Sequence, residues 1–231
     1  MKLTRVTITG ADDAVDPRAL VAISHVFPFV EWGILCSEKR EGQERYPTTE
    51  WRNRFNDALL NAYPPVKTAS CHLCGALSRL AMHGDWSWLT EEKLSAFQRF
   101  QLNGFSQEET DLSIARVFPH LEFVLQVQTR PALVRAQDLS CQHSNVSVLW
   151  DRSGGRGTTE LDWPDPAGLR IGYAGGIGPS NVEAVIREIN AKILHGMYWI
   201  DMESGVRIND RFDLNRVWAV LAAAEPFVGG A

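Results

Sequence analysis

Short runs of β-branched, aromatic and other apolar residues recur along the whole chain, and segments with apolar residues at helical spacing separate them. This alternation is typical of parallel strands joined by crossover helices. About eight such units can be counted, which is the number that closes a barrel of alternating strands and helices. The sequence therefore predicts an α/β protein with the TIM (β/α)8 barrel fold. The predicted strands cover residues 3–9, 29–35, 66–72, 97–102, 121–127, 146–151, 169–174 and 198–201.

Helical segments lie between these strands, and two of them carry signals for their first turn. Asp16 before Pro17 is a typical N-cap followed by proline at the first helical position. Ser180 with Glu183 three residues later has the pattern of a capping box. The polar stretch 37–47 is predicted to be a loop. The predicted helices include residues 17–26, 49–62, 107–117, 181–193 and 214–224.

Several predicted strands have one polar face, although buried parallel strands normally read as continuous apolar runs. Polar groups inside a closed barrel are costly to bury unless they satisfy one another or a ligand. Most of them stand near the carboxyl ends of their strands, where barrel active sites are built. The positions that we expect to point into the barrel are Thr7, Thr9, Arg99, Gln101, Asn103, Gln126, Gln128, Asp151 and Asp201.

The composition is that of an ordinary globular protein, because 45% of the 231 residues are hydrophobic and 22% are charged. This length fits one barrel domain spanning residues 1–231. The net charge of −5 argues against a surface that neutralises phosphates, so we expect no nucleic-acid partner. The absence of a membrane-length apolar run and of a signal-peptide pattern predicts a cytoplasmic protein with no membrane partner. We expect the protein to be either a monomer or a homodimer.

The four cysteines are too few and too irregularly spaced for a secreted disulfide framework, so we expect reduced thiols. Cys71 and Cys74 flank His72, and Cys36 ends the preceding predicted strand, which makes a metal site conceivable. Structural zinc sites usually have two separated ligand pairs, however, and only one CxxC pair is present. We therefore expect no metal and no other cofactor, and we interpret Cys71 as a packed side chain.

Glycine-rich turns follow the last three predicted strands. Glycine lets the backbone approach a ligand closely, and consecutive amides at the start of a helix form an anion site. Barrels typically bind phosphate with the loops after strands seven and eight. These turns favour a phosphorylated small-molecule substrate, whose phosphate would contact Gly154, Gly155, Arg156, Gly157, Gly175, Gly176, Ser204 and Gly205.

Six motifs stand in order along the chain: residues 7–10 (TITG), Gly33 with Arg45 and Tyr46, residues 101–104 (QLNG), residues 151–157 with Asp162 and Trp163, residues 174–182 (AGGIGPSNV), and residues 201–207 (DMESGVR). In the same order, they resemble six motifs of phosphoribosylanthranilate isomerase. These are KICG, a glycine followed by RY, QLHG, an aspartate followed by GGTG and DW, AGGLxPxNV, and DxSSGVE. Members of this family are (β/α)8 barrels that carry out an Amadori rearrangement in tryptophan biosynthesis. The resemblance spans nearly the whole chain, and its last three motifs are specific.

The resemblance implies roles for individual residues. Asp151 would be the general acid on the ribose ring oxygen, and the late glycine loops would hold the phosphate. Arg45, Gln101, Asn103 and Asp201 would contact the substrate. For Asp201 a second role is equally open, because its carboxylate could instead fix the eighth loop by accepting backbone hydrogen bonds.

One departure from the family affects the chemistry. Thr9 stands where the family has the cysteine that removes the proton at C2, and an unactivated hydroxyl is no base near neutral pH. His72, Asp12 and Asp13 are candidate replacement bases. If Thr9 is the decisive loss, the chain isomerises phosphoribosylanthranilate slowly or not at all, and Thr9→Cys raises the rate. The remaining candidates are the thiolates of two cysteines, Cys36 and Cys74.

Two classes of function follow from this pattern. The first is a phosphosugar isomerase, an intramolecular oxidoreductase of the phosphoribosylanthranilate isomerase type that interconverts an aldose and a ketose. The second is a non-catalytic barrel that kept the phosphate site as a sensor or binding protein. Retention of Asp151 favours the enzyme, whereas loss of the cysteine favours the binding protein.

Overall fold

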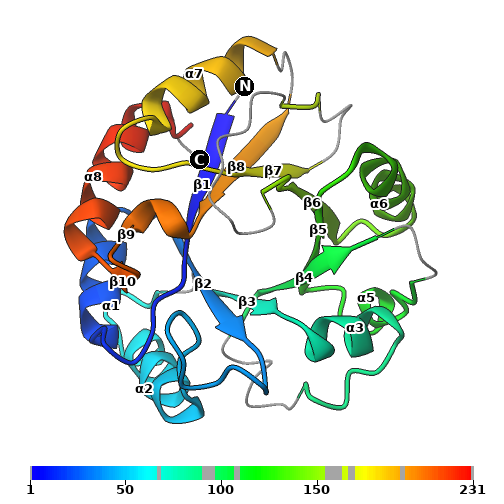
Figure 1. Ribbon diagram of the computed structural model, residues 1–231, viewed down its shortest axis with the longest axis horizontal. Coiled ribbons are helices and arrows are strands. Elements are labelled where there is room, and N and C mark those ends of the chain that lie inside the picture. The colour runs from blue at the N-terminus through cyan, green and yellow to red at the C-terminus, as the bar shows by residue number, and fades with distance from the viewer. Residues whose placement is uncertain are drawn as a thin grey trace.

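Eight parallel strands pair in sequence order and close into a barrel, which confirms the predicted TIM (β/α)8 fold. The computed structural model describes residues 2–66, 69–89, 97–106, 110–153, 163–165, 170–192 and 196–229. Figure 1 shows these strands at the centre of the molecule with helices around them. The strands are β1 (Lys2–Thr9), β2 (Val30–Cys36), β3 (Ala69–Leu73), β4 (Arg99–Phe105), β5 (Glu122–Val127), β6 (Val146–Trp150), β7 (Ile171–Ala174) and β8 (Met197–Met202).

Strands β1 and β8 are direct neighbours, as barrel closure requires. Thr7 pairs with Asp201 of β8, while Thr9 pairs with Gly33 of β2. All eight predicted strands are present, with bounds that shift by up to three residues. Strand β4 runs three residues further than predicted because a bulge containing Gly104, whose φ is 79°, lets the strand pair with β5 again.

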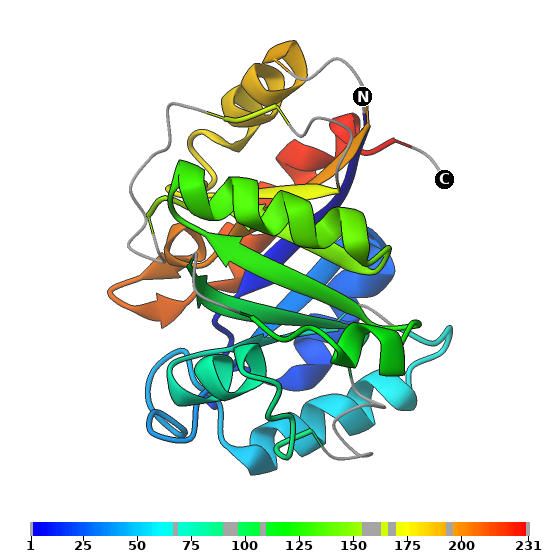
Figure 2. The same ribbon diagram turned by 90° about the vertical axis from the view of Figure 1, so that its right-hand side faces the viewer.

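Helices form the outer layer of the barrel, as the two perpendicular views show (Figures 1 and 2). The bounds of α1 and α8 are those predicted. The helix expected at residues 107–117 is much shorter in the described residues, where only α5 is helical; residues 107–109 lie outside them. In the described part of the chain no helix is both long and apolar enough to cross a membrane. The helices are α1 (Pro17–Val26), α2 (Thr49–Leu60), α3 (Ala76–Met82), α5 (Ile114–Val117), α6 (Arg130–Gln142), α7 (Val182–Lys192) and α8 (Leu214–Ala224).

Polar residues mark where two of these helices begin. The Oδ1 atom of Asp16 accepts a hydrogen bond from the backbone N–H of Arg18 at 3.0 Å, which confirms the predicted N-cap. Helix α7 begins at Val182, so Asn181 precedes it directly and the capping box expected from Ser180 and Glu183 does not form; the side chain of Asn181 instead accepts from the backbone N–H of Gly178 and donates to the carbonyl of Gly176.

The barrel interior contains an apolar layer of four side chains that is separate from the main core. That main core lies between the strands and the surrounding helices. Successive side chains of a strand point to opposite faces of the sheet, so the residues between those that face the helices point into the barrel. The four residues of the inner layer are Val124, Leu149, Ala174 and Trp199.

A charged cluster fills the interior nearer the amino ends of the strands. The buried guanidinium of Arg99 lies 2.5 Å from a carboxylate oxygen of Glu31 and 3.2 Å from one of Glu122. It also stacks over the ring of Trp199 at 4.3 Å. The hydroxyl of Thr7 donates to Glu31 at 2.9 Å. Thr7 and Arg99 are two of the inward polar positions predicted from the sequence. They therefore belong to a structural cluster in which the polar groups bind one another.

Candidate active site

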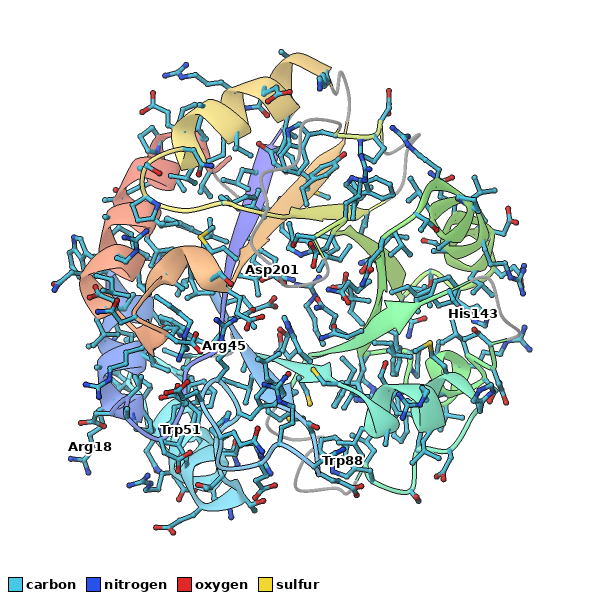
Figure 3. All side chains as sticks on the ribbon, viewed as in Figure 1. Arg18, Arg45, Trp51, Trp88, His143 and Asp201 are labelled. Atoms are coloured by element: carbon cyan, nitrogen blue, oxygen red, sulfur yellow. The ribbon has the colours of Figure 1, made fainter. Side chains whose placement is uncertain are left out.

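A polar cavity of about 720 Å³ opens at the carboxyl ends of the strands. In Figure 3, Asp201 and Arg45 lie inside the ring of helices, whereas Arg18 and His143 lie at its rim. The cavity brings together most of the candidate site residues that fall within the described part of the chain. Those candidates are Thr9, Arg45, His72, Gln101, Asn103, Asp151, Gly175, Gly176, Asp201, Ser204 and Gly205. The other candidates, Gly154, Gly155, Arg156 and Gly157, lie outside the described residues.

Asp151 follows β6 directly and is held in one orientation. Its Oδ2 atom accepts a hydrogen bond from Nε2 of Gln126 at 2.8 Å. Its Oδ1 atom accepts from the backbone N–H and the hydroxyl of Ser153, at 3.1 and 2.6 Å. The side chain is buried, yet the residue lines the cavity. This arrangement fixes a carboxyl group at the cavity wall, as a positioned acid or base requires.

Gln126 and Ser153 were not predicted as site residues, although both shape the site through Asp151. The alternation of polar residues placed Gln126 inside the barrel without giving it a partner. Ser153 stands two residues after Asp151, and this spacing is typical of a carboxylate that accepts from the backbone two residues on. That spacing was the available signal for Ser153.

Thr9 and Asp201 form a buried pair at the ends of the first and last strands. The hydroxyl of Thr9 donates to Oδ1 of Asp201 at 2.9 Å. Gly33 makes room for this hydroxyl, because a Cβ atom at Gly33 would lie 2.2 Å from Oγ1 of Thr9. Burial raises the pKa of the Asp201 carboxyl well above its ordinary value, and the nearby Asp151 carboxyl raises it further, while the Thr9 hydrogen bond opposes the shift.

The raised pKa of Asp201 has a consequence for stability. The folded state binds this proton more tightly than the unfolded state, so the folded protein loses stability as pH rises from about 3.9 through the raised pKa. Asp201→Asn removes this titration. We expect the melting temperature of the variant minus that of the wild type to increase with pH across this window. A difference independent of pH would contradict a raised pKa.

His72 lines the cavity as predicted but is poorly suited to accept a proton. Its Nε2 atom lies 2.9 Å from the hydroxyl of Ser70, and its Nδ1 atom lies 3.3 Å from Nε2 of Gln101. Burial, aided by the positive charge of Arg99, lowers the pKa of His72 to about 3. The ring is therefore neutral near pH 7, and its conjugate acid is too strong for an efficient general base.

Asp12 and Asp13, the other candidate bases, are not among the residues that line the cavity within the described chain. Asp12 pairs with Arg207 at 3.0 Å and accepts from the backbone N–H of Arg45. Asp13 accepts from the backbone N–H of Thr48 at 2.8 Å and from its hydroxyl. Both carboxylates hold loops together.

Of the two candidate thiols, Cys74 is unsuited to act as a base, and Cys36 is not among the residues that line the cavity. Burial raises the pKa of Cys74, which lines the cavity, to about 12. Cys36 and Cys71 lie with their sulfur atoms 3.1 Å apart in the core, and burial raises the pKa of Cys71 well above its ordinary value. In the described part of the chain the cysteines form no disulfide, and no group of three or more His, Cys, Asp or Glu residues is arranged to hold a metal ion.

Gln101 and Asn103 form a chain of side chains along one wall of the cavity. Nε2 of Gln101 donates to Oδ1 of Asn103 at 2.9 Å, and Nδ2 of Asn103 contacts the sulfur of Cys74 at 3.2 Å. Because these bonds fix the amide groups, the wall presents polar atoms to the cavity in a defined arrangement.

Arg45 lines the cavity, but its guanidinium is engaged by acidic side chains. It lies 2.6 Å from a carboxylate oxygen of Glu203 and also pairs with Asp210. These bonds tie the loop after β2 to the loop after β8. Two further guanidinium groups, those of Arg40 and Arg79, line the same cavity.

The loops after β7 and β8 approach each other through glycine. Gly175 and Gly176 adopt positive φ angles of 123° and 61°, which favour glycine. A Cβ atom at Gly205 would lie 1.9 Å from the carbonyl oxygen of Ile177 and 2.9 Å from Cα of Gly178. The sequence motifs therefore produce two closely packed backbone loops at the edge of the cavity.

The closed eight-stranded barrel with a polar cavity at the carboxyl ends of its strands places the protein in the TIM barrel class. The sequence model of the N-(5′-phosphoribosyl)anthranilate (PRA) isomerase family matches residues 90–223, and the chain belongs to this family. No curated protein sequence matches the chain.

Solved structures share the fold. PRA isomerase from Pyrococcus furiosus has 15% sequence identity and a TM-score of 0.56, covering 96% of this chain and 99% of that chain. The enzyme from Thermococcus kodakaraensis has 15% identity and a TM-score of 0.57 with the same coverage. For 3-hexulose-6-phosphate synthase from Salmonella typhimurium the identity is 14% and the TM-score is 0.52, covering 98% of this chain and 100% of that chain. At these identities the likeness establishes the fold alone.

Proposed function

We propose that the protein is a phosphosugar isomerase that acts on a phosphorylated ribosylamine, of which phosphoribosylanthranilate is the first to test. The observation that carries this proposal is the position of Asp151, a fixed carboxyl group that shares one cavity with both glycine loops. Family membership supports the same reaction type. In this proposal the chain acts as one cytoplasmic barrel domain.

The reaction divides the cavity into two regions. The loops containing Gly176 and Gly205 bind the phosphate through backbone amides, because such amides are a preorganised anion site. Asp151 protonates the ribose ring oxygen, and the ring opens to an iminium at C1. Removal of the proton at C2 then gives the enamine, which becomes the ketose. Gln101 and Asn103 are the polar wall against which the open sugar lies.

Ribose 5-phosphate tests the phosphate site by itself. We expect calorimetry to detect binding at millimolar concentration, and we expect Gly205→Ala to weaken it about tenfold to a hundredfold, the cost of one lost charge-assisted hydrogen bond. The added Cβ atom must displace the backbone at Ile177. Gly196→Ala is the control for backbone strain alone, because Gly196 has a φ of 109°, which strains alanine, but an added Cβ atom there would meet no atom within 4 Å and the residue is not among those that line the cavity.

Turnover of phosphoribosylanthranilate separates the two classes of function. Isomerisation by the wild type supports the enzyme. Binding of ribose 5-phosphate without turnover of any ribosylamine favours the sensor or binding protein instead. If neither binding nor turnover occurs, the proposed phosphosugar site is wrong.

A further inference from the structure

The proposed reaction requires a group that removes the proton from C2, and the cavity limits which group this is. His72 and Cys74 line the cavity, but their pKa values, about 3 and about 12, make them poor bases near neutral pH. Two carboxylates at the edge of the cavity, Glu203 and Asp210, are engaged in ion pairs with Arg45. Among the described residues that line the cavity, Asp201 is the carboxyl group that remains once Asp151 serves as the acid.

Asp201 also lies in the right place. Its Oδ1 atom accepts the hydrogen bond from Thr9, so the carboxyl group is adjacent to the position where the family motif has cysteine. Its Oδ2 atom accepts no hydrogen bond from any residue in the described part of the chain, and the residue lines the cavity. We propose that Asp201 is the catalytic base of the isomerisation and that Thr9 is the residue that positions it. This inference rests on the proposed function.

The proton transfer balances without any further reactant. The C2–H bond breaks and its proton moves to Oδ2 of Asp201. The electron pair of that bond forms the C1–C2 double bond, while the π electrons of the C1–N iminium move to nitrogen. Protonation of C1 from Asp201 and loss of the proton from the C2 hydroxyl then give the ketone. That hydroxyl proton restores the acid form of Asp151 through solvent, so the product is an isomer of the substrate.

The charges around Asp201 suit this role. Glu31 from β2 and Glu203 after β8 place negative charge near it, and the carboxyl group of Asp151, directly after β6, does so in its ionised form, while the guanidinium of Arg99 from β4 places positive charge near it. Burial together with these carboxylates raises the pKa of Asp201 well above the ordinary aspartate range. A base is most efficient when its pKa lies near the working pH.

The first test removes the base and keeps the shape. We expect Asp201→Asn to lower kcat by about 10²- to 10⁴-fold, the usual contribution of general-base catalysis. Calorimetry with ribose 5-phosphate should give the same affinity for the variant and the wild type, which shows that the barrel and the phosphate loops are intact. With substrate deuterated at C2, the wild type should show a primary isotope effect on the step that Asp201 carries out.

The second test uses the pH profile, which a purely structural role of Thr9 would not move. Since activity requires ionised Asp201, kcat/KM rises with pH through the raised pKa of this group. The Thr9 hydrogen bond favours the carboxylate, so Thr9→Val should shift this rising limb to higher pH. Thr9→Ser keeps the hydroxyl and should leave the limb in place.

The outcomes separate this inference from the proposed function. Inactive wild-type protein overturns the isomerase and the base together. An active wild type whose Asp201→Asn variant keeps its kcat overturns the assignment of the base alone, as does a rising limb that does not move in Thr9→Val. Thr9→Cys gives a further check, because a gain of about 10²-fold or more would show that the wild type lacks an efficient base.

Discussion

Replacing Arg99 with methionine should lower the free energy of unfolding by about 3 kcal/mol, the lower end of the range for removing one partner of a buried ion pair. Arg99 is 3% exposed and pairs with both Glu31 and Glu122 inside the barrel. Without Arg99, the carboxylate of Glu31 stays buried and its negative charge has one positively charged partner fewer. Arg5 remains 3.3 Å from Glu31, which is why we expect the lower end of the range. Urea unfolding followed by tryptophan fluorescence measures the change.

The matched control removes the charge that Arg99 leaves behind. In the double variant Glu31→Gln, Arg99→Met, no carboxylate remains at position 31, so we expect it to be more stable than Arg99→Met alone. The comparison distinguishes loss of a charge partner from loss of packing against Trp199, which methionine partly preserves. An Arg99→Met protein within about 0.5 kcal/mol of the wild type would mean that this buried cluster contributes little to stability.

The fold could be predicted from the sequence because parallel strands and crossover helices each leave a local periodic pattern. Helix α1, for example, begins at the proline of an Asp–Pro pair and was predicted with the correct bounds. The predicted ends of an element were wrong where tertiary structure decides where the element stops. The bulge at Gly104 that lengthens β4 depends on pairing with β5, and no local pattern encodes it.

The candidate site could be predicted in part for a related reason. The positions of Asp151, Asp201 and Gly205 follow from their places just after strands, because all strand ends of a closed barrel meet on one side. The partners of these side chains could not be predicted. The hydrogen bond from Thr9 to Asp201 joins residues 192 positions apart, and the ion pair of Arg45 with Glu203 joins loops from opposite halves of the chain.

These long-range contacts change the chemical interpretation of individual residues. From the sequence alone, we interpreted Thr9 as the replacement of a catalytic base and Arg45 as a residue that contacts the substrate. In the structure, Thr9 donates to a buried carboxyl group and Arg45 forms ion pairs with two acidic side chains at the edge of the cavity. The replacement of cysteine by threonine is therefore accompanied by a neighbouring group that can accept a proton, which is why the enzyme hypothesis remains the stronger one.

Replacing Asp151 with asparagine should lower kcat by about 10²- to 10⁴-fold, because the amide has no acidic proton to transfer to the ring oxygen. Asparagine keeps the shape and can still accept from Gln126 or Ser153, so we expect unchanged affinity for ribose 5-phosphate. Ser153→Ala is the matched control: it removes one hydrogen bond to Asp151 but leaves the carboxyl group, and we expect it to retain most of the activity.

Steady-state kinetics with phosphoribosylanthranilate for these two variants and for Asp201→Asn then separate the two carboxyl groups by their pH dependence. Loss of the base should remove the rising limb that belongs to Asp201, whereas loss of the acid should leave that limb and lower the whole profile. If Asp151→Asn keeps its rate while Asp201→Asn loses it, the two aspartates do not form an acid and base pair, and ring opening must depend on another group.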